Sequence, residues 1–476
     1  MSLLQTPDNW NSELLENLLV HIIGGDWGKD PDHQEKDYQA VACIRGSEFR
    51  NWSKESGRTA VLRKVKANSL DKRSLLPGDI LLEISGGGPD QPVGRTVLIN
   101  QAVLDQFDIP VVGTNFLRLL RPSAALDQRF LNKYLELFYS SGEVIKYQGG
   151  SNNLRNLKFK EYSQISVPVP PLAEQKVIAD KLDTLLAQVE NTKARLERIP
   201  QILKRFRQSV LASAVNGRLT EEWRALHDFE EDSWSSMPLK NIAEVLDPNP
   251  SHRYPKPEFG GIPILSTQQF AGYSGWTTDK AKQVSRDFFD ERKGKCGFYE
   301  DDIIFARKGR LGLARFAPKG FDYVYSHTVF IVRPRRNVSP SFLLWSLRPD
   351  SVVDYLLMAM NSNTGVPTLG KGVFEKMEVN VPSPEEQTEI VRRVDQLFAH
   401  ADRIEQQVNN ALVRVNNLTQ SILAKAFRGE LTEQWRKDNP ELISGENSAE
   451  ALLERIKAER AAMKPVKKTR SKQATV

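Results

Sequence analysis

The chain has 476 residues, of which 40% are hydrophobic, 26% charged and 8% aromatic. This composition is typical of a soluble folded protein, and the length exceeds the roughly 250 to 300 residues at which single hydrophobic cores stop growing. At least two domains are therefore expected. The 66 Lys and Arg residues outnumber the 60 Asp and Glu residues, so the net charge of +6 permits an anionic partner without requiring one.

Several classes of protein are excluded at this level. No window approaches ~18 uncharged apolar residues, so no membrane span is predicted. The N-terminus lacks a basic stretch followed by an apolar one, so we expect a cytoplasmic protein without a secretory signal. The two cysteines, Cys43 and Cys296, have no Cys or His neighbours at metal-ligand spacing and are interpreted as reduced structural thiols.

Residues 1–166 are predicted to form a globular domain of the α+β class. Residues 78–84 (GDILLEI) and 114–122 (TNFLRLLRP) have the composition of short strands, and residues 129–142 have the spacing of a helix. Loops rich in Gly, Asn and Ser separate these runs. We expect a twisted, mostly antiparallel sheet.

Residues 167–224 follow as a predicted long helix. Apolar side chains recur there at spacings of four and three, and a strict 3.5-residue period over more than four heptads specifies a left-handed coiled coil. Pro200 breaks the local rule, because an internal proline removes a backbone hydrogen bond and kinks a helix. The predicted coiled-coil core of this helix comprises Ile178, Leu182, Leu185, Val189, Leu196, Ile199, Leu203, Phe206 and Val210.

A second copy of this arrangement occupies residues 225–436. Residues 225–378 contain strand-like runs at 301–307 (DDIIFAR) and 327–334 (HTVFIVRP) and a helix-like run at 341–357. Residues 379–436 repeat the long helix and, at an offset of 212, match residues 167–224 at 20 of 58 positions without a gap. The predicted core of the second helix comprises Ile390, Val394, Leu397, Ile404, Val408, Val415, Leu418 and Ile422.

Both long helices close on nearly the same eight residues, GRLTEEWR at 217–224 and GELTEQWR at 429–436. Near their starts, the Glu-Gln pairs at 174–175 and 386–387 suit a first helical turn. Two heptad helices, each preceded by its own domain, pair most simply with each other in antiparallel fashion. We expect a dumbbell with pseudo-twofold symmetry, whose rod of 33 residues is about 50 Å long at ~1.5 Å per residue.

Residues 437–476 form the last predicted segment. A short helix is expected after Asn447, which suits an N-cap because Glu450 follows three residues later. The final run, KPVKKTRSKQATV, is basic and is predicted to be disordered. A solvated end and a contact to DNA are equally open interpretations of it.

No catalytic motif is found. The chain has no GxxxxGK[ST] phosphate loop, no dinucleotide fingerprint after a strand and no HExxH zinc motif. The DPNP run at 247–250 lacks the proline pair and stacking aromatic of an amino-methyltransferase, and the acids of PDHQEK at 31–36 lie too close together for a Mg²⁺ site. Both runs are interpreted as loops, and the chain is predicted not to be an enzyme.

Loops at corresponding places in the two domains mix Arg and Lys with amides, glycines and aromatics. Arg can read guanine bidentately, Asn or Gln can read adenine, and Gly lets a backbone approach phosphate. Ordinary polar loops are the competing interpretation for any one of them, but the recurrence in both halves favours reading of the major groove. The candidate DNA contacts are Trp27, Lys29, Arg45, Arg95, Asn152, Asn153, Arg155, Gln268, Gln269, Arg307, Lys308, Arg310, Asn361 and Asn363.

The repeated segments resemble a known family. Residues 167–224, 418–436 and 439–460 are similar to the conserved regions of the specificity subunits of Type I restriction-modification enzymes, in particular the type IA group. The resemblance is close over both helices and the C-terminal segment. Within the globular parts only general features match, because the recognition domains of that family vary widely, so no contact residue can be carried over.

The resemblance implies a division of labour. Each domain would be a target recognition domain for one half of a split, asymmetric site in double-stranded DNA, and the coiled coil would fix the gap between the halves. Two methylation subunits, which bind S-adenosylmethionine and modify adenine N6, and two motor-nuclease subunits, which use ATP and Mg²⁺, would carry the catalysis, so this chain itself needs no cofactor. Two other functions stay open: a coiled-coil scaffold whose globular ends bind proteins, and a stand-alone nuclease or methyltransferase.

Overall fold

The structure is a computed structural model and describes residues 6–88, 91–151, 154–227, 229, 233–360 and 368–463. It divides into two compact units: unit 1 contains residues 1–195 and 411–476, and unit 2 contains residues 196–410. Two long helices, α6 (Leu172–Val215) and α13 (Pro384–Phe427), contribute one stretch to each unit. The units therefore cut across the five predicted segments, because each half of the helix pair packs with one domain.

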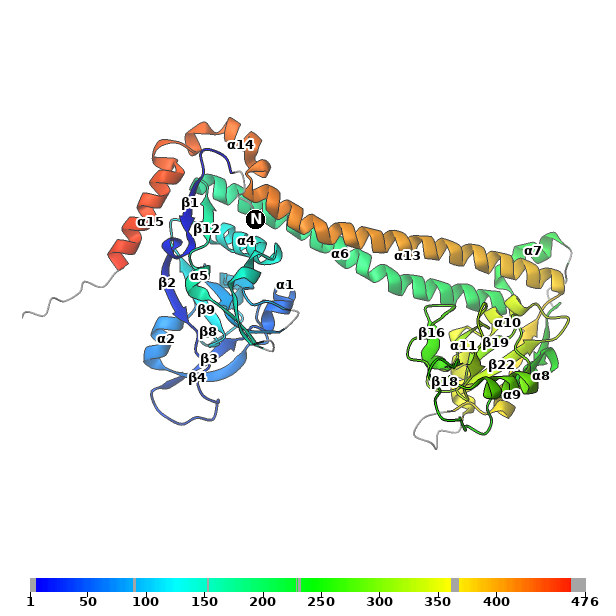
Figure 1. The fold of residues 1–476 in the computed structure, drawn as a ribbon. Helices are drawn as coiled ribbons and strands as arrows, with labels where there is room; N and C mark the ends of the chain where they lie inside the picture. Colours follow the sequence, from blue (N-terminus) through cyan, green and yellow to red (C-terminus); the bar gives the residue numbers. More distant parts are fainter. Residues whose placement is uncertain are drawn as a thin grey trace, which may run out of the picture. The chain divides into compact units, whose positions relative to one another are not determined.

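Unit 1 is built on two main sheets (Figure 1). The first has the strand order β2, β9, β5, β7 and is antiparallel throughout. The second has the order β4, β3, β8, in which β3 and β8 are parallel. Small antiparallel sheets join β10, β11 and β6, and β1 with β12. The strands are β1 (Asn11–Leu14), β2 (Leu19–Gly24), β3 (Tyr38–Ile44), β4 (Val61–Lys66), β5 (Ile80–Glu83), β6 (Ser85–Gly87), β7 (Thr96–Leu98), β8 (Val111–Gly113), β9 (Leu117–Pro122), β10 (Gln148–Ser151), β11 (Leu154–Leu157) and β12 (Ser166–Val169).

The first sheet of unit 1 has a hydrophobic core on each face. In β5, Ile80 and Leu82 pack toward the helices, whereas Leu81 packs toward the second sheet. This alternation follows from the two-residue period of a strand, so every β5 side chain is buried. The helices of the unit, besides its stretches of α6 and α13, are α1 (Trp52–Glu55), α2 (Ala67–Arg73), α3 (Gln101–Leu104), α4 (Gln128–Ser140), α5 (Phe159–Tyr162), α14 (Glu433–Asp438) and α15 (Ala449–Met463).

Unit 2 repeats this framework with shorter strands. Its main sheets have the orders β14, β22, β19, β20 and β18, β15, β21, and β15 and β21 are again parallel. The pairs β13–β23 and β16–β17 are antiparallel. The strands are β13 (Ser235–Pro238), β14 (Ala243–Leu246), β15 (Ile262–Leu265), β16 (Phe270–Ala271), β17 (Gly275–Trp276), β18 (Gln283–Val284), β19 (Ile303–Ala306), β20 (Ala314–Phe316), β21 (Val324–Tyr325), β22 (Val329–Pro334) and β23 (Glu378–Val381). The remaining helices are α7 (Glu221–Leu226), α8 (Leu239–Ile242), α9 (Arg286–Cys296), α10 (Pro340–Ser346), α11 (Asp350–Ala359) and α12 (Lys371–Glu375).

The same ion pair anchors the main sheet of both units. In unit 1, Arg121 of β9 donates to both oxygens of Asp79 at 2.7 Å, and in unit 2, Arg333 of β22 donates to Asp302 at 2.8 and 2.9 Å. Both aspartates are 1% exposed. Two parallel N–H···O bonds to one carboxylate are the strong form of this interaction, so the repeated Arg-Pro dipeptides mark a shared structural element.

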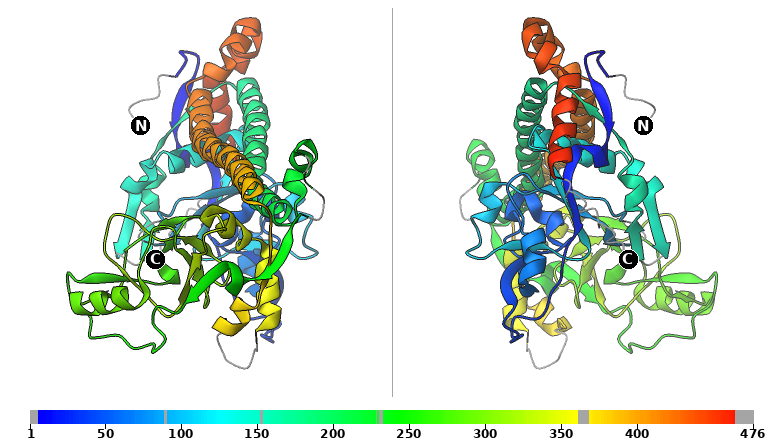
Figure 2. Two further views of the ribbon diagram at one scale, coloured as in Figure 1. Left: turned by 90° about the vertical axis from the view of Figure 1, so that its right-hand side faces the viewer. Right: turned by 90° about the vertical axis from the view of Figure 1, so that its left-hand side faces the viewer.

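In each unit, a stretch of α6 lies beside a stretch of α13 (Figures 1 and 2). In unit 1, Val189 and Ile422 belong to one buried cluster; in unit 2, Arg207 donates to Asp402 at 2.6 Å and to Glu405 at 2.8 Å. Most predicted core positions are buried or half-buried, including the half-buried Leu196, Ile199 and Ile404. Pro200 lies within the continuous α6, and the one-sided kink stays a prediction.

One predicted core position is wrong. Leu418 is 45% exposed, while Thr419 and Leu412 are half-buried instead. The buried and half-buried positions run from Val415 to Thr419 to Ile422, so the four-residue step comes before the three-residue step, the reverse of the predicted order. The last turns of α13 are therefore positioned by packing on the domain of unit 1, where Ile422 and its neighbours join the main core.

Two other predicted elements differ in the structure. The helix-like run at 341–357 forms two helices, α10 and α11, with Pro349 between them. A proline inside one continuous helix would remove a backbone hydrogen bond and clash with the preceding turn. The C-terminal helix α15 begins at Ala449, and Ser448 rather than Asn447 caps it, because Ser448 Oγ accepts from Ala451 N at 3.2 Å. Helix α15 packs alongside β2 (Figure 2) and buries Leu452 and Ile456. The basic run at 464–476 lies outside the described residues.

A buried joint fastens the start of α6 in unit 1. Glu174 is fully buried, and its carboxylate accepts from Trp10 Nε1 at 2.9 Å and from Thr432 Oγ1 at 2.6 Å. The guanidinium of Arg436 completes the joint as an ion pair. The charge of Glu174 is thus compensated inside the protein, which a buried carboxylate requires.

Unit 2 contains the same joint at the start of α13. Glu386 is fully buried and accepts from Trp234 Nε1 at 3.0 Å and from Thr220 Oγ1 at 2.6 Å. Arg224 supplies the positive charge. The Thr and Arg of the repeated eight-residue phrases are therefore the partners of a glutamate at the start of the other long helix.

The glycine of each phrase ends its helix. Gly217 and Gly429 have φ values of +79° and +74°, the left-handed conformation that terminates many helices and that favours glycine. A Cβ atom on Gly429 would lie 2.4 Å from the side chain of Pro7 and 2.9 Å from Arg436. The repeated phrase is thus a helix stop followed by the two side chains of the joint.

Candidate nucleic-acid interface

The edge strand β4 of unit 1 presents basic side chains beside an exposed tryptophan. Trp27 is 37% exposed, and the guanidinium carbon of Arg63 lies 4.3 Å from the centre of its ring. Lys29 is exposed and exchanges backbone hydrogen bonds of 2.8 and 3.0 Å with Lys64. Lys66 is exposed at the end of the strand. We call these five residues the basic edge; its cations suit phosphate contacts, and its aromatic ring suits stacking.

The basic edge was only partly predicted. Trp27 and Lys29 were candidates, whereas the three cations of β4 were not, although the run VLRKVK combines β-branched residues with the basic side chains that edge strands often carry. Two acids lie next to it, since Arg63 pairs with Asp30 and Lys66 with Asp37 at 4.0 Å. A phosphate would therefore meet the exposed Lys29 without first displacing a carboxylate partner, whereas the half-buried Lys64 donates to the carbonyl oxygen of His33.

Two other arginine candidates of unit 1 have acidic partners. Arg95 donates to Glu83 at 2.8 and 2.6 Å and to the carbonyl oxygen of Gly46 at 3.0 Å. Because Glu83 is 3% exposed, this ion pair belongs to the domain interior, and Arg95 is no longer a candidate for base contact. Arg45 binds Glu48 from Nε at 2.9 Å, but its side chain stays 40% exposed, so it remains a candidate.

The glycine- and asparagine-rich loop of unit 1 forms part of a small sheet. Arg155 lies on β11, which pairs with β10 and β6, and is half-buried. The predicted amide contacts Asn152 and Asn153 lie outside the described residues. These positions stay predictions.

In unit 2, two adjacent glutamines have different roles. Gln268 is exposed, as a reading side chain needs to be. Gln269 is 4% exposed, and its Oε1 accepts from Ser266 N at 3.1 Å and from Ser266 Oγ at 2.6 Å in a capping box. Gln269 is therefore removed from the candidates, because its acceptor oxygen serves the local turn.

The ARKGRLG loop of unit 2 likewise contains one arginine that is paired within the domain and one that is exposed. Arg307 pairs with Asp247 at 2.6 Å and donates to the carbonyl oxygen of Leu369 at 3.1 Å, so it fastens the loop and is no longer a candidate. Arg310 is exposed, and its guanidinium donates a long hydrogen bond of 3.3 Å to the carbonyl oxygen of Phe270. Lys308 is half-buried beside it. The predicted contacts Asn361 and Asn363 lie outside the described residues.

An aromatic and histidine cluster near this loop was not predicted. The rings of His252 and His327 are stacked with centroids 4.4 Å apart, and Tyr254 Oη lies 2.8 Å from His327 Nδ1. Burial, the neighbouring His252 and the cations of Lys308 and Arg307 lower the pKa of His327. The cluster therefore favours the neutral imidazole of His327, and Tyr254 and His327 lie 73 positions apart, which no local sequence pattern connects.

A buried arginine positions the hairpin that follows Gln268. Arg315 is 1% exposed, donates to the carbonyl oxygens of Ala271 and Gly275, and lies 3.9 Å from the ring of Phe270. Burial and the neighbouring cations of Arg348 and Arg310 lower its pKa to about 10. Its charge thus polarises the backbone of β16 and β17 from inside the domain.

Neither a metal site nor a membrane-spanning helix is found in the described part of the chain. No three His, Cys, Asp or Glu side chains come together there as a metal site would require. Within the same residues, no helix is both long enough and apolar enough to cross a bilayer.

Comparison with known proteins identifies the class to which this framework belongs. The family model of the Type I restriction modification DNA specificity domain matches residues 26–201 and 231–414, which include most of both domains and most of both long helices. The EcoKI specificity subunit of Escherichia coli (strain K12) is 35% identical over 484 residues, covering 99% of this chain and all of that protein. The EcoBI specificity subunit of Escherichia coli is 43% identical over 349 residues, covering 69% of this chain and 72% of that protein. The chain belongs to the family of Type I restriction enzyme specificity subunits, a non-catalytic family.

Solved structures have the same fold. The HsdS subunit from Thermoanaerobacter tengcongensis aligns with a TM-score of 0.54 at 16% identity, covering 89% of this chain and 98% of that one. A chain from a structural study of assembly and conformational transition in a type I R-M system aligns with a TM-score of 0.65 at 14% identity, covering 89% and 99%. The predicted fold class is confirmed: two α+β recognition domains with mostly antiparallel sheets and two long antiparallel helices.

Proposed function

We propose that this chain reads DNA sequence for a Type I restriction-modification complex, with each domain reading one half of a bipartite, asymmetric site. The observation that carries the proposal is that the two units share a framework but differ in their exposed loops. The ion-paired sheets and the buried glutamate joints are equivalent, whereas unit 1 exposes the basic edge and unit 2 exposes Gln268 and Arg310. A common scaffold with different polar surfaces is what reading two different half-sites requires.

We further propose that the helix pair sets the spacer between the half-sites. A run of 33 heptad residues corresponds to about 50 Å, or roughly 15 base pairs at ~3.4 Å each. Insertion of one heptad into both helices, between 195 and 196 and between 410 and 411, would add about 10 Å. The expected result is a spacer longer by roughly three base pairs with both half-sites unchanged.

The partners proposed are double-stranded DNA, two methylation subunits and two motor-nuclease subunits. Adenine-N6 methylation with S-adenosylmethionine, and cleavage with ATP and Mg²⁺, would take place on those subunits. The support is the family itself, whose relatives are named as specificity subunits of restriction enzymes. A cytoplasmic location follows from this role.

The experiment that tests the proposal maps N6-methyladenine across the host genome with and without this gene. We expect a bipartite motif that disappears with the gene. Replacement of residues 1–166 by another recognition domain should change one half of the motif only. A methylation pattern independent of the gene, or equal affinity of the complex for all duplexes, would favour a protein-binding scaffold instead. Methylation by the isolated chain would overturn the assignment of catalysis to the partners.

A further inference from the structure

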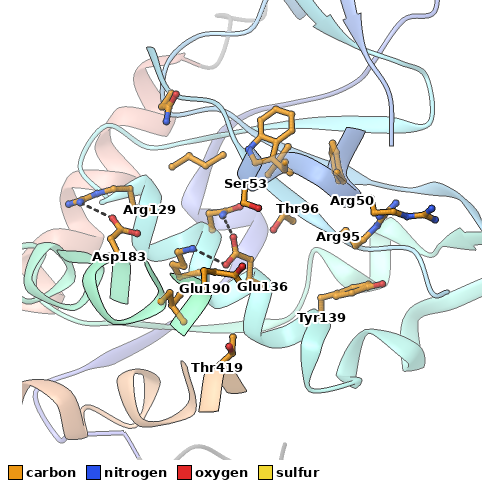
Figure 3. A pocket seen from close by; sticks show the side chains of 18 residues that line it. Arg50, Ser53, Arg95, Thr96, Arg129, Glu136, Tyr139, Asp183, Glu190 and Thr419 are labelled. Atoms are coloured by element: carbon orange, nitrogen blue, oxygen red, sulfur yellow. Dashed lines mark hydrogen bonds and ion pairs between the residues drawn. The ribbon is translucent and has the colours of Figure 1, made fainter. Parts of the chain in front are cut away.

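A cavity of about 620 Å³ lies in unit 1 between the recognition domain and the helix pair (Figure 3). One wall is the segment formed by η2 (Glu48–Asn51) and α1, including Trp52. A second wall is α4, including Lys133 and Glu136, and a third comprises Leu186 and Glu190 of α6. The volume falls within the range of about 300 to 1,000 Å³ that is usual for ligand pockets.

The internal repeat identifies the residues of unit 2 that occupy equivalent places. At the offset of 212, Lys133 corresponds to Trp345, Leu186 to Phe398 and Thr419 to Arg207.

The facing loop can be matched through the parallel strands. Ile44 pairs with Gly113 in unit 1, and Leu265 pairs with Tyr325 in unit 2. Trp52 follows Ile44 by eight positions, and Tyr273 follows Leu265 by the same number. Both loops therefore bring an aromatic ring toward the helix pair of their own unit.

In unit 2 the equivalent space is filled by the chain itself. The ring of Tyr273 lies 5.6 Å from that of Phe398 and 6.4 Å from that of Trp345. The guanidinium carbons of Arg348 and Arg207 lie 4.4 and 6.0 Å from the Tyr273 ring. Stacked aromatic and guanidinium groups of this kind attract one another in a desolvated site.

Unit 1 keeps the acidic residue of this arrangement, and three of the cations that line its cavity already have acidic partners: Lys133 pairs with Glu136 at 3.0 Å, Arg129 with Asp183 at 3.3 Å and Arg95 with Glu83 at 2.6 Å. Arg207 of unit 2 pairs with Asp402, whose equivalent in unit 1 is Glu190. In the described part of the chain, Glu190 forms no ion pair, because Thr419 replaces the arginine. Figure 3 shows Glu190 beside Glu136 within the cavity, with Thr419 below them. The cavity thus combines a free carboxylate with the half-buried ring of Trp52.

We propose that this cavity docks a protein partner that inserts an arginine and a neighbouring aromatic side chain, the pair that unit 2 supplies from its own residues. The guanidinium would pair with Glu190, and the aromatic ring would pack between Trp52 and Leu186. Arg50, exposed at the other end of the cavity in Figure 3, would donate to a backbone carbonyl of the inserted segment. Arginine and aromatic residues are the usual anchors of protein interfaces. Because unit 2 fills the equivalent space with its own side chains, only unit 1 would bind such a partner in this way.

The test titrates the full-length chain with the probe acetyl-Tyr-Arg-amide and, as the charge-reversed control, with acetyl-Tyr-Glu-amide, using calorimetry. We expect saturable binding of the first probe at one site per chain, at least tenfold tighter than the second. Thr419→Arg should fill the cavity with its own guanidinium, and Glu190→Lys should reverse its charge. Each change is expected to weaken binding at least tenfold, whereas Thr184→Arg, an exposed change on α6 outside the cavity, should leave it unchanged.

The proposal is overturned if the arginine probe does not saturate, if both probes bind equally, or if a folded Thr419→Arg chain keeps the wild-type affinity. If Thr419→Arg fails to fold, the affinity of Glu190→Lys for the arginine probe becomes the test, because this change adds little volume at an exposed position. Because no DNA is present, a negative result would leave the proposed reading of DNA untouched, and loss of DNA reading would not affect this result.

Discussion

Glu174, at the start of α6, forms a buried ion pair with Arg436, which follows it by 262 residues in the chain. Within unit 1, the first turn of α6 therefore contacts the segment 429–436, which follows the end of α13. Glu386 and Arg224 form the equivalent pair in unit 2. One chain therefore contains two versions of the same joint, and each can be altered while the other serves as an internal reference.

Removal of the joint carboxylate is expected to destabilise its own unit. Glu174→Ala should lower the free energy of unfolding by about 3 to 5 kcal/mol, because it leaves the Arg436 guanidinium buried without a counter-charge. The double change Glu174→Ala with Arg436→Met should recover part of this loss. Hydrogen exchange, followed separately in the two units, is the measurement.

The matched control for the joint is Glu190→Ala, at an exposed acid on the same helix, which should change the free energy of unfolding by less than about 0.5 kcal/mol. Glu386→Ala should increase exchange in unit 2 first. If Glu174→Ala increased hydrogen exchange equally in both units, the joint would not stabilise unit 1 alone.

Arg307 and Arg310 are separated by three positions, but they are expected to behave differently. Arg310→Ala should weaken binding of a specific duplex and reduce the slope of log affinity against log salt by about 1, because one phosphate contact is lost. Its stability should be unchanged, since the side chain is exposed and its hydrogen bond to the carbonyl oxygen of Phe270 is long at 3.3 Å. Arg307→Ala should instead lower stability by about 1 to 3 kcal/mol, because Asp247 loses its partner.

Fluorescence anisotropy with a labelled duplex at several salt concentrations, together with denaturant unfolding, separates the two arginines. An unchanged salt dependence for Arg310→Ala would remove that residue from the interface. A stable Arg307→Ala chain with weakened DNA binding would restore Arg307 as a contact.

Protonation of His327 is expected to make unit 2 less stable in mild acid. Burial comes first among the causes that lower its pKa below the ordinary value of 6.5, followed by His252 and two nearby cations. Between the folded and unfolded pKa values the unfolded chain binds more protons, so stability is complete above pH 6.5 and is lost as the pH falls below it. His327→Gln should remove this part of the pH dependence. Denaturant midpoints between pH 7.5 and 5.5 measure it, and identical pH slopes in both chains would contradict the assignment.

The long helices and central strands were predictable because each follows from a periodic pattern of apolar residues. Heptad spacing predicted both long helices, and short apolar runs such as those at 78–84 and 301–307 predicted the central strands. Composition predicted the α+β class. These features depend on neighbours in the sequence, which a single chain displays.

The partners of charged residues were not predictable in the same way. Glu174 and Glu386 suit a first helical turn, but nothing local shows that they are fully buried or that distant Thr and Arg residues reach them. The same limit applies to the candidate interface: Arg95 and Arg307 have the chemistry of DNA contacts, yet buried or half-buried acids of their own domains engage them. Which arginines are available is decided by tertiary packing, as are the exposed positions of Lys29 and Arg310.

The two cysteines are expected to report separately on the two units. Cys43 of β3 is fully buried, and burial raises the pKa of its thiol from 9.0 to about 12. This shift lowers the thiolate fraction at pH 8 by roughly a factor of 1,000, and the thiolate is the form that reacts. Cys296, at the end of α9, is half-buried, and burial raises its pKa as well.

A disulfide reagent such as 5,5′-dithiobis(2-nitrobenzoic acid) at pH 8 should therefore modify Cys296 first in the folded chain. In Cys296→Ser, the remaining thiol should react only as fast as β3 opens, and Glu174→Ala should accelerate that reaction because the joint stabilises the same unit. In strong denaturant both thiols should react at the rate of a free cysteine. Rapid reaction of Cys43 in the folded Cys296→Ser chain would show that the sheet around β3 is open to solvent and would contradict the buried position of this strand.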